Sequence, residues 1–254
     1  MAVTLLEDFQ HLIEGGLQEN TIYLVRGVPA SGKTLFALTL MRELAERGRT
    51  VVYLTTELSP EDLRDHVKHG FGWELGELEK QGKLILLDGY SWKVGKCDHD
   101  SHRVDLTNLS EMSASLACLT QELKQKPLPE DGRPFFFVFD TLSSLVLYND
   151  LTTVIKFMQI QVARFREAKV SSLLLLEEGI DDQPVMEKLS FSVDGMFETK
   201  LLEAHGELHR YLRILAVRRA MHYTGWVQFQ STKEGFKFVT PLRERMWEAE
   251  AKRP

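Results

Sequence analysis

Residues 27–34 constrain the fold of this chain more than any other part of its sequence. They read Gly-Val-Pro-Ala-Ser-Gly-Lys-Thr and match the phosphate-binding pattern Gly-x-x-x-x-Gly-Lys-[Ser/Thr]. The apolar run 21–26 precedes this motif, and the amphipathic run 35–45 follows it. A strand, a glycine-rich loop and a helix in this order hold phosphates at the helix N-terminus. The sequence therefore predicts an α/β fold with a phosphate-binding loop (P-loop) between its first strand and the next helix.

The residue types of this loop suit the chemistry of a phosphate site. Gly27 and Gly32 let the backbone curve around a phosphate with no Cβ in the way. The N–H groups of the loop and of the helix N-terminus direct partial positive charge at the anion. We expect Lys33 to reach the β- and γ-phosphates, with its ammonium exposed in an empty loop, and the Thr34 hydroxyl to bind Mg²⁺. The candidate nucleotide-binding residues are Gly27, Val28, Pro29, Ala30, Ser31, Gly32, Lys33 and Thr34.

The composition limits the class of protein. The chain has 254 residues, of which 43% are hydrophobic and 27% charged, as in an ordinary globular protein with room for one large α/β domain. The net charge of −6 argues against broad, nonspecific affinity for nucleic acid or anionic membranes. Two cysteines make no disulfide framework. Because the sequence also shows no signal-peptide pattern and no apolar run of about 20 residues, we expect a cytoplasmic protein without a membrane span.

Strand and helix patterns alternate over most of the chain, which is typical of a mostly parallel central sheet flanked by helices. After the first strand, the predicted strands of this part are residues 50–55, 83–88, 135–139 and 170–176. The predicted helices include one with Ser59 as N-cap and Pro60 at its first position, and others at 109–126 and 151–168. Residues 89–107 show no clean period and predict a long loop.

The last third of the chain has a different pattern. Its predicted strands, 191–202, 208–218, 226–230 and 236–239, are joined by short turns. This pattern indicates a C-terminal antiparallel β-meander that extends the parallel sheet. We expect a single domain over residues 1–240 and a short charged tail over 241–254.

Three carboxylates follow predicted strands. Asp140 closes an apolar strand, the position from which an aspartate holds the shell of a Mg²⁺ ion, although such an aspartate is also a common helix N-cap. Glu57 lies just past the strand 50–55, where a carboxylate can orient water as a general base; the alternative is an ordinary glutamate of a surface loop. Glu177 is a candidate second polar group near the γ-phosphate.

The order of these motifs resembles a known family. The P-loop, a strand followed by Thr-Thr-Glu-Leu-Ser-Pro (55–60), an apolar run ending in Asp-Thr-Leu-Ser (140–143), a strand ending in glutamate and a terminal meander look like the KaiC-type branch of the RecA/RadA ATPase superfamily. The resemblance covers about residues 5–240 and includes the Gly15-Gly16 pair before the first strand. It implies a RecA-like P-loop NTPase fold and ATP binding with slow hydrolysis.

The resemblance also implies roles for individual residues. Lys33 and Thr34 match the family's phosphate and Mg²⁺ residues, and Asp140 matches the Walker B aspartate. Glu57 matches the first of two adjacent catalytic carboxylates. The segment 214–225 is similar to a family segment that reaches across a subunit interface to a neighbour's ATP, and Arg218 matches its arginine. The alternative for Arg218 is a meander residue with a solvated head group.

The chain departs from the family pattern at three positions. The second carboxylate is Leu58, the interface lysine is Ala216, and the glycine after the interface arginine is Arg219. The lost carboxylate and lysine argue against fast hydrolysis and against a hexameric ring. Adenine as the base is implied by the resemblance alone.

Two further clusters are weaker candidates. Residues 97–102, Cys-Asp-His-Asp-Ser-His, are of metal-ligating types but lack the spacing of a zinc site, so a polar loop is the preferred interpretation. A basic cluster on the meander suggests DNA binding, but the loop 178–184 is acidic and would repel phosphates. The basic residues are Arg210, Arg213, Arg218, Arg219 and His222.

Three functional interpretations follow. The leading one is a regulatory or signalling ATPase that binds ATP and Mg²⁺, hydrolyses ATP slowly, and thereby switches an oligomer or a surface for a partner protein. The second is a nucleotide-binding scaffold with little turnover, for which the archaellum accessory ATPase FlaH and the Elongator RecA-like subunits are precedents. The third, less favoured, is a recombinase-like DNA-dependent ATPase.

Overall fold

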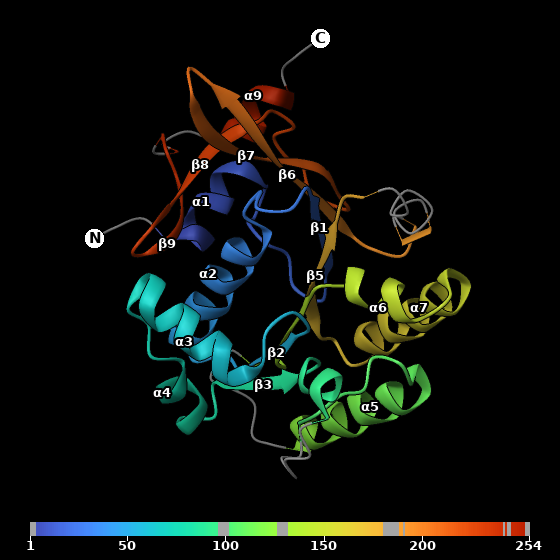
Figure 1. Cartoon of the computed structure of the whole chain (residues 1–254). Coiled ribbons are helices and arrows are strands. Elements are labelled where there is room, and N and C mark those ends of the chain that lie inside the picture. Colours follow the sequence, from blue (N-terminus) through green and yellow to red (C-terminus); the bar gives the residue numbers. More distant parts are fainter. Residues whose placement is uncertain are drawn as a thin grey trace.

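A nine-stranded sheet organises the part of the chain that the computed structural model describes, which is residues 4–95, 102–125, 132–179, 188–189, 191–240, 242 and 245–251 (Figure 1). The strand order is β3-β2-β4-β5-β1-β6-β7-β8-β9. Pairing is parallel from β3 across to β6 and antiparallel from β6 to β9. The predicted α/β fold, a mostly parallel sheet with a C-terminal antiparallel meander, is therefore confirmed. The strands are β1 Ile22–Gly27, β2 Val51–Thr55, β3 Leu84–Asp88, β4 Phe136–Asp140, β5 Ser171–Glu177, β6 Gly195–Ala204, β7 Glu207–Val217, β8 Val227–Thr232 and β9 Gly235–Phe238.

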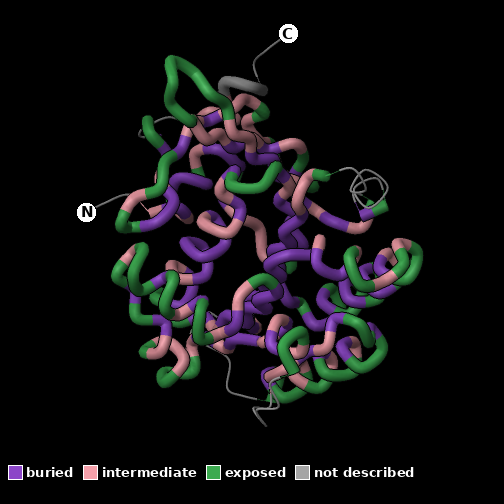
Figure 2. The backbone as a smooth tube through the Cα atoms, viewed as in Figure 1, coloured by how far each residue is buried: buried purple, intermediate pink, exposed green. Residues whose placement is uncertain are grey.

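Helices cover the two faces of the parallel part, and each face has its own apolar core (Figures 1 and 2). Alternate residues of β2 show the division, because Val51 and Tyr53 pack on one side and Val52 and Leu54 on the other. One core includes residues of α1 to α4, and the other includes residues of α5 to α7. The helical elements are α1 Leu5–Leu12, α2 Lys33–Glu46, α3 Pro60–Phe71, α4 Leu75–Lys80, η1 Ser91–Val94, α5 Leu109–Gln125, α6 Ser143–Tyr148, α7 Leu151–Glu167 and α9 Met246–Ala251.

The start of α3 follows from its sequence. The Ser59 Oγ accepts a hydrogen bond from the Asp62 N–H, and Pro60 occupies the first turn, as predicted. This cap ends the short connection after β2, so the intervening residues, Glu57 among them, stay at the end of that strand.

Two local predictions were wrong in their extent, and a short helix was missed. Residues 89–107 are not simply a loop, since η1 lies within them and Arg103 forms a bridge with Asp88 at the edge of β3. The six-residue α6 was missed because it is too short to show a helical period. The strand predicted from residue 191 begins only at Gly195, because the N–H groups of Ser192 and Val193 donate to the Leu189 carbonyl in a turn.

Parallel pairing brings the carboxyl ends of six strands to one edge of the sheet. Thr55 is in register with Asp140, and Gly27 with Glu177. The P-loop, Glu57, Asp140 and Glu177 therefore gather at this edge, which we call the nucleotide edge. No helix in the described part of the chain combines the length and apolar character needed to cross a membrane.

Candidate functional site

The P-loop connects β1 to α2 at the nucleotide edge. Gly32, the N-cap of α2, has φ +102°, a left-handed conformation that favours glycine. The structure gives a different reason for glycine at position 27 from the predicted one. A Cβ on Gly27 would lie 2.2 Å from Thr199 Oγ1 and 2.4 Å from the Thr199 carbonyl oxygen, so its missing side chain makes room for β6 rather than only for a phosphate.

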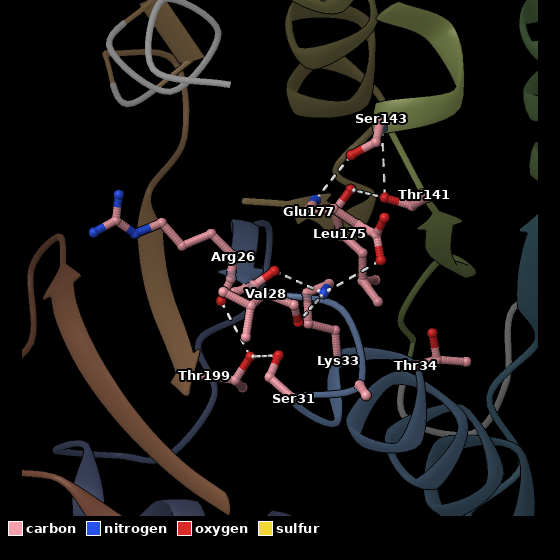
Figure 3. A network of polar contacts seen from close by, with 12 residues as sticks. Arg26, Val28, Ser31, Lys33, Thr34, Thr141, Ser143, Leu175, Glu177 and Thr199 are labelled. Carbon is pink, nitrogen blue, oxygen red and sulfur yellow. Dashed lines mark hydrogen bonds and ion pairs between the residues drawn. The ribbon is translucent and has the colours of Figure 1, made fainter. Parts of the chain in front are cut away.

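Residues of β6, β7 and β8 contact the P-loop, and the sequence did not predict these contacts. The Ser31 and Thr199 hydroxyl oxygens are 2.7 Å apart (Figure 3). Arg210 Nε donates to the Ala30 carbonyl oxygen at 3.0 Å. A Cβ on Gly32 would lie 2.8 Å from the Phe229 ring. The sequence predicted these strands, but no local pattern tells which of their residues meet the loop, since that depends on strand register.

Lys33 is folded back onto its own loop, so the expectation of an exposed ammonium was wrong. Its side chain is 5% exposed, and Nζ donates to the carbonyl oxygens of Gly27 at 2.8 Å and Val28 at 2.9 Å (Figure 3). Glu177 Oε1 lies 3.6 Å from the same nitrogen. Burial lowers the pKa of Lys33, and the charge of Glu177 acts in the opposite direction. The loop carbonyls and Glu177 thus hold the ammonium.

Thr34 and Asp140 form the candidate Mg²⁺ site. Thr34 Oγ1 donates to Asp140 Oδ1 at 3.3 Å, and the buried Tyr53 hydroxyl donates to Oδ2 at 2.5 Å. Burial raises the pKa of Asp140 to about 6, against the effect of these two hydrogen bonds. A buried carboxylate beside a hydroxyl is a hard-oxygen donor set that fits Mg²⁺, so the residues present suit the ion. Tyr53 orients this carboxylate and was missed because it reads as an ordinary strand residue.

Glu57 lies in the connection between β2 and α3, and its side chain is exposed. Desolvation by its surroundings raises the pKa of Glu57, the charge of Glu177 raises it further, and Lys33 and Lys93 lower it. The structure thus brings Glu57 into the same electrostatic cluster as Lys33 and Glu177. Leu58, in contrast, packs against the core on the α2 side, so it is a packing residue at the position of the second carboxylate.

Hydrogen bonds between neighbouring strand ends fix Glu177. Its N–H donates to Ser143 Oγ at 2.9 Å, and the Thr141 hydroxyl donates to the Leu175 carbonyl oxygen at 2.9 Å (Figure 3). These contacts join the start of α6 to the end of β5, which sets the distance between Glu177 and the P-loop.

Arg218 does not reach the site of its own chain. Its backbone N–H donates to the Asp194 carbonyl oxygen. Its guanidinium lies 3.6 Å from Asp194 Oδ1 and donates to the Phe191 carbonyl oxygen. Along β6 the P-loop end is marked by Thr199, the register partner of Gly27. At about 3.3 Å per residue, Asp194 is about 17 Å from there, at the opposite edge of the sheet.

The predicted basic cluster on the meander is dispersed. Arg210 contacts the P-loop, Arg213 pairs with Glu198 and lies over the Trp226 ring, and Arg218 is at the far edge. The cluster therefore offers no continuous basic surface through these three side chains. Most of the metal candidate, residues 97–101, lies outside the described residues, and the described ones contain no group of three possible metal ligands.

The fold and the site together define a nucleotide-binding P-loop protein with a RecA-like fold. A family model described as "ATPase: KaiC" matches residues 2–243. The chain therefore belongs to the KaiC-like ATPase family, as its motifs suggested, and is an ATP-binding P-loop ATPase by family.

The chain is similar both to proteins of about its own length and to longer ones. A UPF0273 protein of Methanopyrus kandleri is 26% identical over 234 residues, which cover 89% of this chain and 86% of that protein. The circadian clock oscillator protein KaiC of Nostoc sp. is 25% identical over 246 residues, or 94% of this chain and 44% of that protein. The crystal structure of a KaiC-like protein from Pyrococcus horikoshii superposes with a TM-score of 0.74 at 25% identity and covers 91% of this chain and 95% of that chain.

Proposed function

We propose that this protein is a slow, Mg²⁺-dependent ATPase whose turnover switches a protein-interaction surface or an oligomer. The observation that carries the proposal is the position of Lys33, held by two loop carbonyls and Glu177. A γ-phosphate would compete for this ammonium and release Glu177 and the loop. Nucleotide state is thereby coupled to the conformation of the nucleotide edge.

The residues divide the chemistry among them. Lys33 and the N–H groups at the start of α2 would bind the phosphates, and Thr34 with Asp140 would hold a Mg²⁺ ion, which neutralises phosphate charge when bound. Glu57 would orient the attacking water and accept its proton, for which a raised pKa is suitable. Glu177 would contribute a polar group close to the γ-phosphate. The domain of residues 1–240 would contain every one of these groups.

Arg218 supports an oligomeric form of the proposal. Because it lies at the edge of the sheet opposite the P-loop, a role for it in hydrolysis would have to be at the nucleotide of another copy. The test is to mix Arg218→Ala with Glu57→Gln protein. Mixed interfaces would combine an intact Arg218 with an intact Glu57 and restore part of the activity, whereas no rescue at any ratio would indicate a site complete within one subunit.

A scaffold with little turnover is the second candidate function. The packing of Leu58 against the core and the Ala216 departure favour it, since each removes a charged group that the family uses. A DNA-dependent ATPase has less support because the basic residues of the meander are dispersed. Single-stranded DNA that leaves turnover unchanged would exclude it.

Steady-state ATP hydrolysis with Mg²⁺, measured against protein concentration, separates these functions. Specific activity that rises with concentration supports a site completed by a neighbouring copy. Turnover that falls sharply but stays measurable in Glu57→Gln, while ATP binding survives, supports catalysis by Glu57. ATP binding without turnover in the unaltered protein would refute the proposed hydrolysis and leave the scaffold.

A further inference from the structure

A lysine that belongs to none of the predicted motifs lies beside Glu57. Lys93 is on η1, within the segment 89–107 that was predicted to be a loop. Its Nζ donates to the carbonyl oxygen of Thr56 at 2.9 Å, and Thr56 immediately precedes Glu57. Lys93 therefore holds the peptide group from which Glu57 projects.

The connection from β3 to η1 is built to bring Lys93 to this place. The Gly89 N–H donates to the Thr55 carbonyl oxygen at 2.8 Å, and a Cβ on Gly89 would lie only 3.0 Å from that oxygen. Asp88 Oδ1 accepts hydrogen bonds from the N–H groups of Tyr90 and Ser91, which caps the start of η1. The turn is thus fastened to the end of β2, so the position of Lys93 is set by the fold.

Two aromatic rings lie near the ammonium of Lys93, which is an exposed residue. Lys93 Nζ is 5.1 Å from the Tyr90 ring centroid and 5.6 Å from that of Tyr148, which belongs to α6. Trp92 packs edge-on against Tyr148 at 4.9 Å and donates through Nε1 to the Gly89 carbonyl oxygen. Ring faces attract a cation, so this arrangement favours a positively charged group at this point.

The other polar groups of Thr56, the residue whose carbonyl Lys93 holds, are also fixed. Thr56 is buried, its N–H donates to the Asp140 carbonyl oxygen at 2.9 Å, and its hydroxyl donates to Ser144 Oγ at 2.9 Å. Lys93 completes these contacts through the Thr56 carbonyl oxygen. The backbone leading to Glu57 is therefore located relative to Asp140 by Thr56 and relative to η1 by Lys93.

We propose that Lys93 is a positioning residue for ATP hydrolysis, which acts through the Thr56 carbonyl to fix the backbone carrying Glu57. It also supplies a cation in cis, in a chain that has Ala216 where the family has its interface lysine. The inference rests on the proposed function, because it assigns Lys93 to the same hydrolytic step. It also gives a role to η1, which the motifs leave unexplained.

The test compares Lys93→Met with the unaltered protein in Mg²⁺-ATP turnover and in fluorescent ATP-analogue binding. Loss of a charge-assisted hydrogen bond that orients the base should lower kcat roughly tenfold. The KM and the nucleotide Kd should stay within about twofold, because Lys93 does not hold the phosphates. Lys93→Arg retains charge and donors and should recover most of kcat. Lys80→Met is the matched control, since it removes an exposed lysine of α4 whose side chain pairs with Glu77.

A double variant shows whether Lys93 acts through Glu57. In a Glu57→Gln background, Lys93→Met should cause little further loss of kcat, because the group it positions is already absent. Additive losses, an equal loss in ATP affinity, or failure of Lys93→Arg to recover activity would overturn the inference while leaving the ATPase intact. Absence of turnover in the unaltered protein would refute the proposed function itself and this inference with it.

Discussion

Gly27→Ala should damage both the fold and the nucleotide site. The new Cβ would lie 2.2 Å from Thr199 Oγ1, 2.4 Å from the Thr199 carbonyl oxygen and 2.7 Å from Ser31 Oγ. Two of these atoms belong to flexible side chains, but the carbonyl oxygen is backbone in the strand paired with β1. Relief therefore requires β1 and β6 to separate at the P-loop.

The expected cost can be worked from this geometry. Overpacking typically costs about 1–3 kcal/mol, and a clash with paired backbone belongs at the upper end, about 3 kcal/mol. For a chain of this size, that corresponds to a fall of roughly 6–12 °C in the midpoint of thermal unfolding. Because the displaced atoms adjoin the P-loop, ATP affinity should fall as well.

The assay is thermal unfolding followed by circular dichroism, with ATP-analogue binding on the same samples. Gly70→Ala is the matched control, since Gly70 lies in α3 with nothing within 4 Å of the added Cβ, and alanine there should stabilise by up to about 1 kcal/mol. Thr199→Ala should rescue Gly27→Ala only slightly because the carbonyl clash remains. An unchanged midpoint for Gly27→Ala, or full rescue by Thr199→Ala, would refute the reasoning.

Three further predictions concern buried polar groups. Lys33→Met should abolish ATP binding in a nucleotide titration, and it should cost only about 1 kcal/mol in urea unfolding because the side chain's volume is kept while its hydrogen bonds are lost. Tyr53→Phe leaves one Asp140 oxygen without its donor and should cost about 1–3 kcal/mol in the same assay, whereas an unaffected stability would contradict that contact. Burial, with the charges of Glu43 and Glu7, raises the pKa of Asp8 from 3.8 to about 6. Folding therefore favours the neutral Asp8 carboxyl over the ionised one. The stability that this preference contributes is full below about pH 4 and is lost as the pH rises through 6. Asp8→Asn should therefore be more stable by about 1–3 kcal/mol at pH 7 and show no gain at pH 4, which unfolding at the two pH values measures.

Sequence patterns predicted the parts of this site that depend on neighbours in the chain. The P-loop, the strand ends at Asp140 and Glu177, and the cap at Ser59 are each specified by a few consecutive residues. The same patterns could not show Thr199 and Arg210 behind the loop, or Lys93 beside Glu57. Those contacts join residues far apart in sequence, and strand register and the path of a turn decide them. The folded-back Lys33 was missed for a different reason, since the motif identifies the lysine but does not show that the Gly27 and Val28 carbonyl oxygens accept from its ammonium.

The two edges of the sheet set the kind of assembly that the proposed use of Arg218 demands. The P-loop is at one edge and Arg218 at the other, so an arginine acting on a neighbour's nucleotide requires contact between unlike edges. A two-fold dimer meets this requirement when its copies lie side by side with their strands antiparallel, because the P-loop edge of each copy then lies beside the Arg218 edge of the other. A head-to-tail arrangement also meets it, and that arrangement closes into a ring or continues as a filament. A dimer in which the two P-loop edges face each other leaves both copies of Arg218 remote, so activity that rises with concentration in such a dimer would exclude Arg218 as the group supplied by the neighbour.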